Sequence, residues 1–358
     1  MRNLILFFFI TLLALISGCS KNQVNRIKAD NLNSAPHKEE RFTNRYPGTK
    51  TYPYSCEDNC YPPTNQIRCE SDMENCQFIG INPSVTKQTG FVINWLGHAS
   101  FEIETPSGLR FLIDPVFSQF DWPVNLAFKL THDFERKTPN YTLDKQKPVS
   151  AVMYSHLHYD HFNKRDVTQI GNKTRYLVPM GFASHFSQNH YKITEMDWFT
   201  STSVEQATVH FVPAHHFNSR IWVPFLYDDT NETLWGGWLV EEAGKTLFFA
   251  GDTGYSQHFK DIYTQFGEID ICLLPIASYF HEQHETWYRY VHTRPEDAIA
   301  AANDLKCKVT IPWGYGNASW QMGDHSSHSP LFRLLKMLKT LKTDSQFIIL
   351  NEGDTISL

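Results

Sequence analysis

A run of metal-binding residue types directly follows an apolar stretch in the middle of the chain. The stretch covers residues 149–154, and residues 155–161 then read Ser-His-Leu-His-Tyr-Asp-His. Imidazole and carboxylate groups are the ligands that zinc-type ions prefer. Residues two apart in an extended segment point the same way, so His156 and His158 can hold one ion while the Asp-His pair turns toward a neighbouring position. The alternative is a histidine-rich surface turn, so the interpretation requires further ligands elsewhere in the chain.

Three further regions repeat this design, in which an apolar, strand-like segment ends in a potential ligand. In layered α/β proteins, ligands collect at the carboxyl ends of strands. An isolated residue of this kind is usually a helix cap or a satisfied polar side chain, but the repetition predicts one constellation. The strand-end residues are His98, Asp114, the pair His215 and His216, and Asp252 within Gly-Asp-Thr-Gly.

These motifs resemble those of the metallo-β-lactamase fold hydrolases. Within that superfamily they resemble the branch of phospholipases D that hydrolyse N-acyl phosphatidylethanolamine. The resemblance covers residues 89–358 and implies a four-layer αββα sandwich for that region. The motifs that carry it are Trp95–Ser100, Ile113–Ser118, Ser155–His161, Gly251–Tyr255 and His292–Ala298.

The resemblance implies a centre with two zinc ions. Such a pair activates water near neutral pH and neutralises the charge that develops at a phosphorus or acyl carbon. Asp160 and His292 are implied to act in catalysis, and Asp114 to orient a ligand from behind the site. His98 is expected to line the pocket, or equally to be a buried histidine bonded to backbone. The implied ligands are His156, His158 and His216 for one ion, Asp160 and His161 for the second, and Asp252 between them.

The chain departs from the family pattern at one ligand of the second ion. Related enzymes have a histidine before a Trp-Gly pair, whereas this chain has Pro312 before Trp313. Proline cannot bind a metal. A substitute from a loop, His325 or His328 first among them and His281 or His284 less directly, is the leading expectation. A weaker second metal and a single catalytic metal remain open. His215 precedes His216, and the family register favours His216 as the ligand.

The N-terminus predicts export and lipid anchoring. Residues 1–18 combine a short basic start with an apolar stretch, and residues 15–19 read Leu-Ile-Ser-Gly-Cys, which resembles a lipoprotein cleavage site. Acylation of Cys19 would anchor the protein, and Ser20 favours the outer membrane, facing the periplasm. An ordinary secretory signal is the alternative. Residues 19–63 are polar and are expected to form a tether, with a cysteine-containing segment at 56–88 leading into the hydrolase domain.

The cysteines agree with an oxidising compartment. Four of the seven lie close together in polar, turn-rich sequence, which favours two disulfides over a zinc knuckle and leaves their connectivity open. These four are Cys56, Cys60, Cys69 and Cys76. Cys272 and Cys307 lie in apolar, strand-like runs and are expected to be buried thiols.

Length and charge restrict the remaining options. The 358 residues suffice for one large α/β domain, and a net charge of −6 with mixed signs gives no nucleic-acid footprint. Helices are expected at residues 295–305 and 329–341. Strands are expected at residues 91–95, 101–104, 109–113, 149–154, 175–178, 208–212, 234–240, 246–250, 271–275, 309–311 and 346–351.

The sequence therefore predicts a zinc-dependent hydrolase that cleaves a phosphodiester of a membrane phospholipid, such as an N-acyl phosphatidylethanolamine. Aromatic residues near Asp114 and after His216 can form an acyl groove, although such residues more often pack onto the core. One alternative is a lactonase or carboxylic-ester hydrolase. Another is a non-catalytic envelope protein that has kept the fold.

Overall fold

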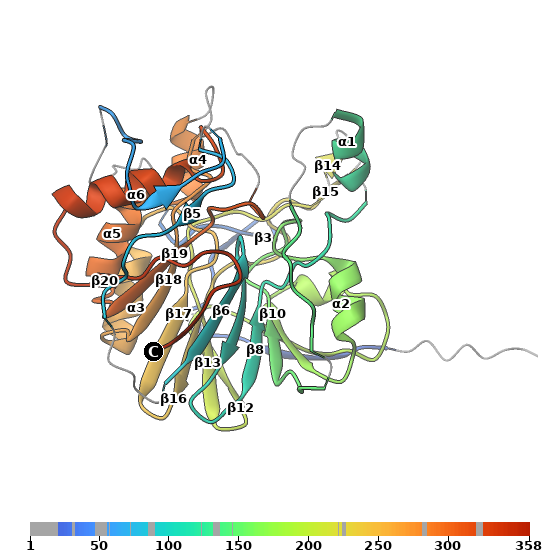
Figure 1. Cartoon of the computed structure of the whole chain (residues 1–358). Coiled ribbons are helices and arrows are strands. Elements are labelled where there is room, and N and C mark those ends of the chain that lie inside the picture. The colour runs from blue at the N-terminus through green and yellow to red at the C-terminus, as the bar shows by residue number, and fades with distance from the viewer. Residues whose placement is uncertain are drawn as a thin grey trace, which may run out of the picture.

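Two β-sheets packed face to face form the centre of the molecule (Figure 1). The structure is a computed structural model and describes residues 21–30, 33–46, 56, 58–71, 73–84, 90–122, 124–131, 137–144, 146–220, 222–223, 227–280, 285–319 and 325–358. The predicted signal sequence, Cys19, His281 and His284 lie outside these residues.

The first sheet has eight strands and begins with a segment that lies far from the others in sequence. Its order is β1 (Gln23–Ile27), β11 (Lys192–Met196), β10 (Arg175–Pro179), β9 (Ala151–Met153), β8 (Arg110–Ile113), β7 (Ser100–Glu104), β6 (Val92–Gly97) and β21 (Thr355–Ser357). From β1 to β8 neighbouring strands are parallel, so their carboxyl ends share one edge.

The second sheet has seven strands. Its order is β12 (Thr200–Val204), β13 (Ala207–Val212), β16 (Gly237–Glu242), β17 (Lys245–Phe249), β18 (Ile271–Pro275), β19 (Val309–Trp313) and β20 (Gln346–Phe347). Every residue of β18 and β19 is buried, as expected for parallel strands covered on both faces. Short hairpins add β2 (His37–Lys38) with β3 (Arg41–Phe42), β4 (Ile67–Arg68) with β5 (Gln77–Phe78), and β14 (Trp222–Val223) with β15 (Tyr227–Asp228).

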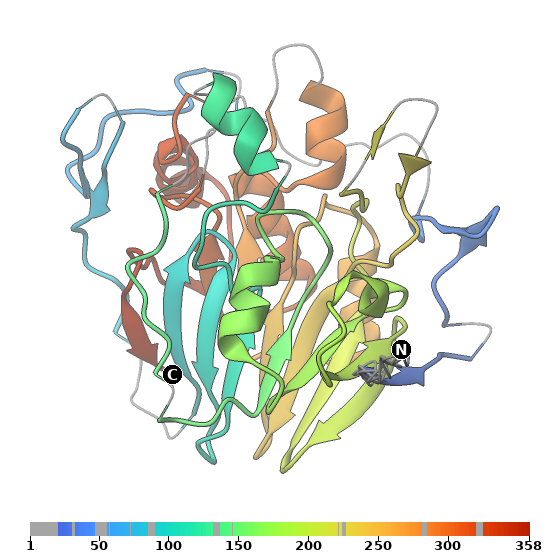
Figure 2. The same cartoon turned by 90° about the vertical axis from the view of Figure 1, so that its right-hand side faces the viewer.

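Helices cover the outer faces of both sheets, which confirms the αββα arrangement (Figures 1 and 2). Against the second sheet lie α3 (His258–Phe266), α5 (Pro295–Asp304) and α6 (Ser329–Thr340), and against the first lies α2 (Lys164–Ile170) with the 3₁₀ turn Phe182–His185. Two further helices, α1 (Val124–Thr131) and α4 (Glu285–Val291), stand at the same end of the molecule, beyond the sheets (Figure 2).

Large aromatic side chains fill the space between the sheets. Trp313 of β19 stacks on Phe249 of β17 at 5.2 Å between ring centroids, and Phe101 of β7 meets both rings edge-on. All three are fully or almost fully buried. Because they link strands of both sheets, they fix the relative position of the two edges from which the site residues emerge.

The expected helices at 295–305 and 329–341 are confirmed to within one residue. Both begin with proline in the first turn, where its missing N–H costs no hydrogen bond. In α5 the side chain of Asp297 accepts a hydrogen bond from the backbone N–H of Arg294, which caps the helix. The sequence did not predict the edge strand β1 or helices α1 to α4.

The expected tether at residues 19–63 is wrong for the part that the structure describes. Residues 23–27 form β1, which pairs in parallel with β11, and Arg26 forms an ion pair with buried Glu195. Ala35 and Phe42 are buried in the main core. An edge strand with exposed side chains lacks the apolar alternation that identifies strands, so its composition resembles a linker.

Among the described residues three disulfides are formed. The clustered cysteines pair as Cys56–Cys60 and Cys69–Cys76, in agreement with the two expected bridges. The expectation of buried thiols at Cys272 and Cys307 is wrong, because these residues form the third bridge. They lie in β18 and just before β19, and the parallel pairing of these strands brings them together. Sequence gave no indication of that pairing.

Candidate metal centre

The predicted site residues converge at the carboxyl ends of the strands. The loop after β9 carries His156, His158, Asp160 and His161, the loop after β13 carries His216, and the loop after β17 carries Asp252. The turn between β6 and β7 contributes His98, Asp114 directly follows β8, and α4 ends just before His292. In the described residues these side chains form four overlapping groups in which the candidate ligand atoms lie within 4.8 Å of one another.

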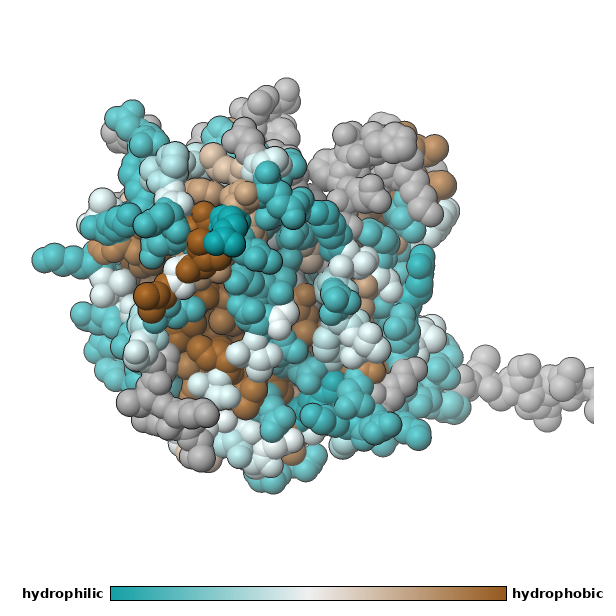
Figure 3. Space-filling view, in the orientation of Figure 1, coloured by the Kyte–Doolittle hydropathy of each residue, from teal (hydrophilic) through white to brown (hydrophobic). Residues whose placement is uncertain are grey.

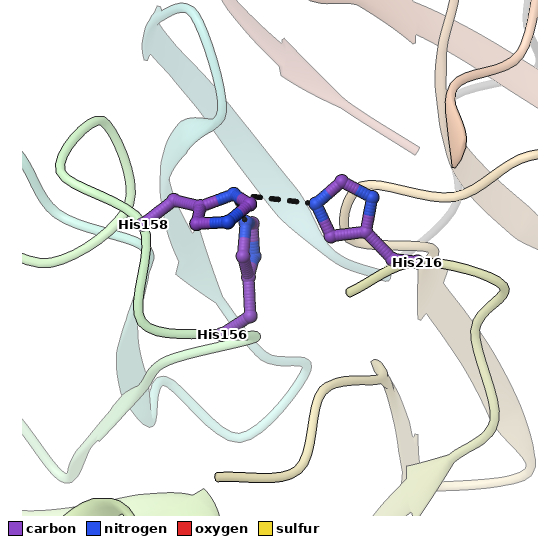
Figure 4. Close-up of side chains that lie close together, drawn as sticks. All are labelled: His156, His158 and His216. Atoms are coloured by element: carbon purple, nitrogen blue, oxygen red, sulfur yellow. Dashed lines mark hydrogen bonds between the residues drawn. The ribbon is translucent and has the colours of Figure 1, made fainter. Parts of the chain in front are cut away.

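One half of the centre consists of three imidazoles, drawn in Figure 4. The Nδ1 atom of His158 lies 2.9 Å from Nε2 of His156 and 3.3 Å from Nε2 of His216. Two ligands at about 2.1 Å from one ion at a tetrahedral angle are about 3.4 Å apart. The three nitrogens therefore point at a common position with the spacing that a zinc-type ion needs. We call these three residues the imidazole half.

The other half contains His98, Asp160 and His161, and we call it the acid half. Nε2 of His161 lies 3.3 Å from Oδ2 of Asp160 and 3.3 Å from Oδ2 of Asp252. Nε2 of His98 lies 2.8 Å from Oδ2 of Asp160. All three members of the acid half are buried. This concentration of negative charge in a buried place calls for a compensating cation.

Asp252 lies between the two halves. Its Oδ2 atom is 4.0 Å from Nε2 of His156 and 3.9 Å from Nε2 of His216, in addition to its approach to His161. His292 approaches the same oxygen at 3.5 Å from its Nε2 atom. Asp252 is the residue to which the resemblance assigns a bridging role, and His292 stands beside it and lines the cavity.

Asp114 supports the acid half from behind. It is fully buried, it accepts hydrogen bonds from the backbone N–H and the hydroxyl of Ser155, and Nδ1 of His161 donates to its Oδ2 at 2.7 Å. Burial raises the pKa of Asp114 more than these hydrogen bonds lower it. Because Nδ1–H of His161 is engaged in this way, Nε2 is the atom that faces the centre.

A buried polar atom tests whether a cation fits. Nε2 of His161 is buried and has no hydrogen-bond partner among the described residues, yet it faces two carboxylates. Burial disfavours a charged ring, but Asp252 and Asp160 outweigh it and hold the pKa of His161 well above its usual value. The position therefore holds a positive charge, which a metal ion supplies as well as a proton. The donor set of nitrogen and carboxylate oxygen suits zinc-type ions.

The imidazole half differs because its rings favour the neutral state. Burial lowers the pKa of His156 and His216 well below the usual value and lowers that of His158 to about 4. Neutral imidazole is the form that binds metal. Asp160 and Asp252 show the opposite balance: burial alone would raise the pKa of each carboxyl, but the nearby His161 outweighs it and keeps both pKa values well below the usual range.

A residue of the N-terminal segment also contacts the imidazole half. The sequence analysis did not predict this contact. The side chain of Asn44 donates to the carbonyl oxygen of His216 at 2.8 Å and accepts from the backbone N–H of His216 at 3.0 Å. Nδ1 of His216 bonds to the carbonyl oxygen of Val291 at 2.9 Å. An asparagine in a polar segment 172 residues earlier gives no sequence signal for such a contact.

His215 does not face the centre. Its Nε2 atom lies 3.1 Å from the carbonyl oxygen of Tyr46, and its ring packs against Tyr290. The structure thus supports the register that selects His216. The turn toward the N-terminal segment explains why two adjacent histidines occur here.

The structure does not bring the expected substitute ligands to the centre. The ring of His325 packs edge-on against Tyr61, 4.6 Å between centroids, and His328 precedes α6, where its Nδ1 atom contacts the hydroxyl of Ser327. Neither belongs to the four groups found among the described residues. Pro312 lies within β19, beside Leu274 of β18.

A cavity of about 310 Å³ opens onto the centre. Its polar wall is formed by residues of the centre and by Ser278, and its remaining walls are mostly aromatic. The lining residues are Phe120, Val124, His158, Tyr159, Asp160, Phe217, Asp252, Ser278, Trp287, Tyr288 and His292. Val124 belongs to α1, and Trp287 and Tyr288 to α4, so the two helices beyond the sheets form the rim.

Comparison with known proteins identifies the family. Residues 109–315, over half of the chain, match the model of the beta-lactamase superfamily domain. This chain belongs to the metallo-β-lactamase superfamily. Within the superfamily, an uncharacterized protein of Mycobacterium tuberculosis is 32% identical over 253 residues, which cover 68% of this chain and 63% of the relative. The chain thus spans less than two thirds of the length of that relative.

Other members of the superfamily are similar over different portions. A UPF0173 metal-dependent hydrolase of Myxococcus xanthus is 25% identical over 74% of this chain and 83% of the relative. The outer membrane protein RomA of Klebsiella pneumoniae is 31% identical over 33% of this chain and 80% of the relative.

Solved structures confirm the fold alone. An isothiocyanate hydrolase from Delia radicum gut bacteria has a TM-score of 0.53 at 15% identity, over 75% of this chain and 99% of that chain. CmlA, a diiron β-hydroxylase from Streptomyces venezuelae, has a TM-score of 0.54 at 16% identity, over 77% of this chain and 55% of that chain. Because one fold carries both chemistries, the reaction must be argued from the site.

Proposed function

We propose that the protein is a metal-dependent hydrolase that cleaves a phosphodiester in an amphiphilic substrate, a phospholipid of the N-acyl phosphatidylethanolamine type. The observation that carries the proposal is the juxtaposition of the two halves of the centre with an aromatic cavity. The similarity to a relative named as a metal-dependent hydrolase supports the reaction class. Zinc ions held by the two halves would supply Lewis acidity and an activated water near neutral pH.

The residues of the chain divide the remaining work. The imidazole half and the acid half would hold the ions, and Asp252 would fix their separation. His292 lines the cavity with its Nε2 atom beside Asp252 and its Nδ1 atom buried, so it stands where a leaving oxygen would lie. In the hydrolysis, the bond from phosphorus to the head-group oxygen breaks and the water oxygen bonds to phosphorus. We infer that His292 passes a proton to the leaving oxygen.

The cavity and its rim favour a substrate with an apolar portion. Phe120, Phe217 and Trp287 line the cavity, and Trp287 is 47% exposed at its mouth. Trp122, just before α1, and Leu130, in α1, are 76% and 74% exposed. Hydrophobic surface is visible on α1 in Figure 3. Exposed apolar residues around a pocket mark a ligand or membrane contact, whereas scattered single residues need no such explanation.

The reaction can be tested with zinc-loaded protein and two phosphodiester substrates, one a micellar lipid and one soluble. N-acyl phosphatidylethanolamine in mixed micelles should be hydrolysed faster than bis-p-nitrophenyl phosphate. His292→Ala should lower kcat by about 10²–10⁴-fold while zinc content is retained, because a proton donor rather than a ligand is lost. His210→Ala is the matched control, since His210 pairs with Glu241 away from the centre. Wild-type turnover in the His292→Ala variant would remove the assigned role.

The rim has its own test. Trp287→Ala should raise KM for the micellar lipid severalfold and leave hydrolysis of the soluble phosphodiester unchanged, because only the apolar part of the substrate loses a contact. Ile81→Ala provides the control, since Ile81 is 95% exposed and does not line the cavity. Equal effects of both substitutions would argue against an acyl groove.

A lactonase or carboxylic-ester hydrolase is the second candidate. The same donor set polarises a carbonyl oxygen as readily as a phosphoryl oxygen. Cleavage of lactones or p-nitrophenyl esters without cleavage of either phosphodiester would select this candidate. A purified protein that binds zinc but hydrolyses none of these substrates would instead favour a non-catalytic envelope protein.

We also propose that the protein is anchored by lipid at Cys19 in the outer membrane. Six of the seven cysteines form disulfides, and the remaining one is Cys19. The partial similarity to a protein named as an outer membrane protein supports this location. In the described residues, no helix is long and apolar enough to cross a bilayer. Cys19→Ala should release the protein from membranes without changing turnover of the soluble substrate; continued membrane association would contradict the anchor.

A further inference from the structure

The acid half lacks the ligand that β19 would be expected to deliver. Pro312 and Trp313 end this strand, and neither side chain can bind a zinc-type ion. Asp160, His161 and Asp252 remain, and they place two carboxylate oxygens within 3.3 Å of one imidazole nitrogen. A tetrahedral site of this kind requires a fourth donor.

His98 reaches the position where that donor is needed. It is 4% exposed, and its Nε2 atom lies 2.8 Å from Oδ2 of Asp160. Its backbone has a φ of +49°, in the left-handed region that non-glycine residues seldom adopt. The indole N–H of Trp95 donates to the carbonyl oxygen of His98 at 2.9 Å. The turn is therefore held in an unfavourable backbone conformation that directs the ring toward the centre.

A hydroxyl group from the loop after β19 contacts the other ring nitrogen of His98. The hydroxyl of Ser319 lies 3.4 Å from the carbonyl oxygen of Tyr315, to which it donates, and 2.9 Å from Nδ1 of His98. In the tautomer in which this hydroxyl accepts from Nδ1–H, the lone pair of Nε2 faces Asp160 and is available to a metal ion.

We propose that His98 is a ligand of the second metal ion, in place of the imidazole that Pro312 replaces, and that Ser319 is its positioning residue. The loop after β19 would then retain a part in the site, because it supplies the hydrogen bond that orients the ring instead of the ligand itself. The inference rests on the two-metal part of the proposed function and not on its substrate. Failure of the phospholipid assay therefore leaves it standing.

Metal content provides the first test. Wild-type protein dialysed against excess zinc should hold close to two ions per chain by elemental analysis, and His98→Ala close to one. His325→Ala is the matched control and should keep two, since His325 packs against Tyr61. Ser319→Ala should weaken binding of the second ion by about 10-fold, and Ser319→Thr should restore it because the hydroxyl returns. Two tightly bound ions in His98→Ala, or a single ion in the wild type, would overturn the proposal.

A second measurement observes the metal–nitrogen bond directly in the wild-type protein. In wild-type protein loaded with ¹¹³Cd and labelled with ¹⁵N-histidine, a scalar coupling should join the metal to Nε2 of His98. The signal would be assigned by its loss in His98→Gln. A ring that only orients Asp160 would show no coupling, and that result would reduce His98 to a hydrogen-bond partner of Asp160.

Discussion

The two halves of the metal centre are built on different electrostatic principles. The imidazole half contains three rings whose burial keeps them neutral, so it presents lone pairs and no charge. The acid half buries Asp160 beside Asp252 and compensates with His161. A buried charge is tolerated only when it is paired. Without a metal, the imidazole half therefore carries no uncompensated charge. The carboxylates of the acid half, in contrast, require a proton or a metal ion to balance their negative charge.

The halves also differ in what holds them in place. In the imidazole half, His216 is held by the carbonyl of Val291 and by the side chain of Asn44, and the hydroxyl of Ser155 contacts Nδ1 of His156. In the acid half, the supports are side chains, because His161 donates to Asp114 and His98 pairs with Ser319. A side-chain substitution can therefore remove the partner of either His98 or His161, whereas it cannot remove the backbone carbonyl that contacts the ring of His216.

The largest effect should follow from removing a ligand of the imidazole half. His158→Ala should lower both zinc content and activity, the activity by more than about a hundredfold, since even the loss of an outer partner of a metal ligand costs about 10–100-fold. The comparison predicts that the acid half of this variant can still be occupied. Elemental analysis and initial rates provide the measurement. Unchanged zinc content with full activity would show that His158 is not a ligand.

Removing a support of the acid half should have the next largest effect. Asp114→Asn keeps the size of the side chain but weakens the acceptor for Nδ1–H of His161. Affinity for the second ion should fall by about 10–100-fold, and affinity for the first should change little. A zinc titration monitored by calorimetry separates the binding of the first ion from that of the second. Asp144→Asn, in an exposed loop, is the control; a uniform loss at both steps in Asp114→Asn would contradict the division into halves.

A smaller effect is expected from removing Asn44, whose side chain holds the backbone of His216. Asn44→Ala removes two hydrogen bonds to His216 and should lower the free energy of unfolding by about 1–3 kcal/mol. First-site zinc affinity should fall only severalfold, because the carbonyl of Val291 still orients the ring. Chemical unfolding, with Asn25→Ala in the exposed strand β1 as control, measures the first quantity. If the free energy of unfolding falls no more in Asn44→Ala than in the control, the N-terminal segment does not stabilise His216.

The smallest effect concerns the pH dependence of the metal-free protein. The pKa of His158 is lowered to about 4 in the folded chain, mainly by burial, against about 6.5 when unfolded. The unfolded state therefore binds more protons between these values, and stability should fall as the pH decreases from about 6.5 to about 4. In His158→Ala this fall should be smaller, by about 1 kcal/mol or less because His158 is partly exposed. Identical pH slopes of urea unfolding would contradict the lowered pKa.

Sequence predicted those parts of the site that lie in one local motif. His156, His158, Asp160 and His161 share a single loop, and His216 and Asp252 each follow an apolar strand, so residue types and strand ends sufficed. The αββα fold followed from the resemblance that these motifs carry. The expectation of a substitute for the missing ligand named His325 and His328 first, and His281 and His284 less directly. His98 was expected only to line the pocket. The ligand role proposed for it depends on Ser319, which is 221 residues away and meets His98 only through packing of the two sheets.

The other features that the sequence did not predict have a common physical cause. The polar, exposed β1 pairs through backbone groups that any sequence carries, so its pattern could not distinguish it from a linker. The Cys272–Cys307 bridge depends on the parallel neighbours β18 and β19, which residue spacing does not reveal. Asn44 acts through a contact that spans 172 residues. Each of these features depends on which strands become neighbours, and apolar periodicity carries no such information.

The early start of β1 has a consequence for orientation. Gln23, its first residue, is four positions beyond Cys19, and four residues span at most about 14 Å. Because β1 runs parallel to β11, β10 and β9, its first residue lies at the end of the sheet opposite the metal centre. If Cys19 is acylated as proposed, this short link would hold the end of the sheet opposite the metal centre close to the membrane surface. On that proposal the cavity would open away from the leaflet that holds the anchor.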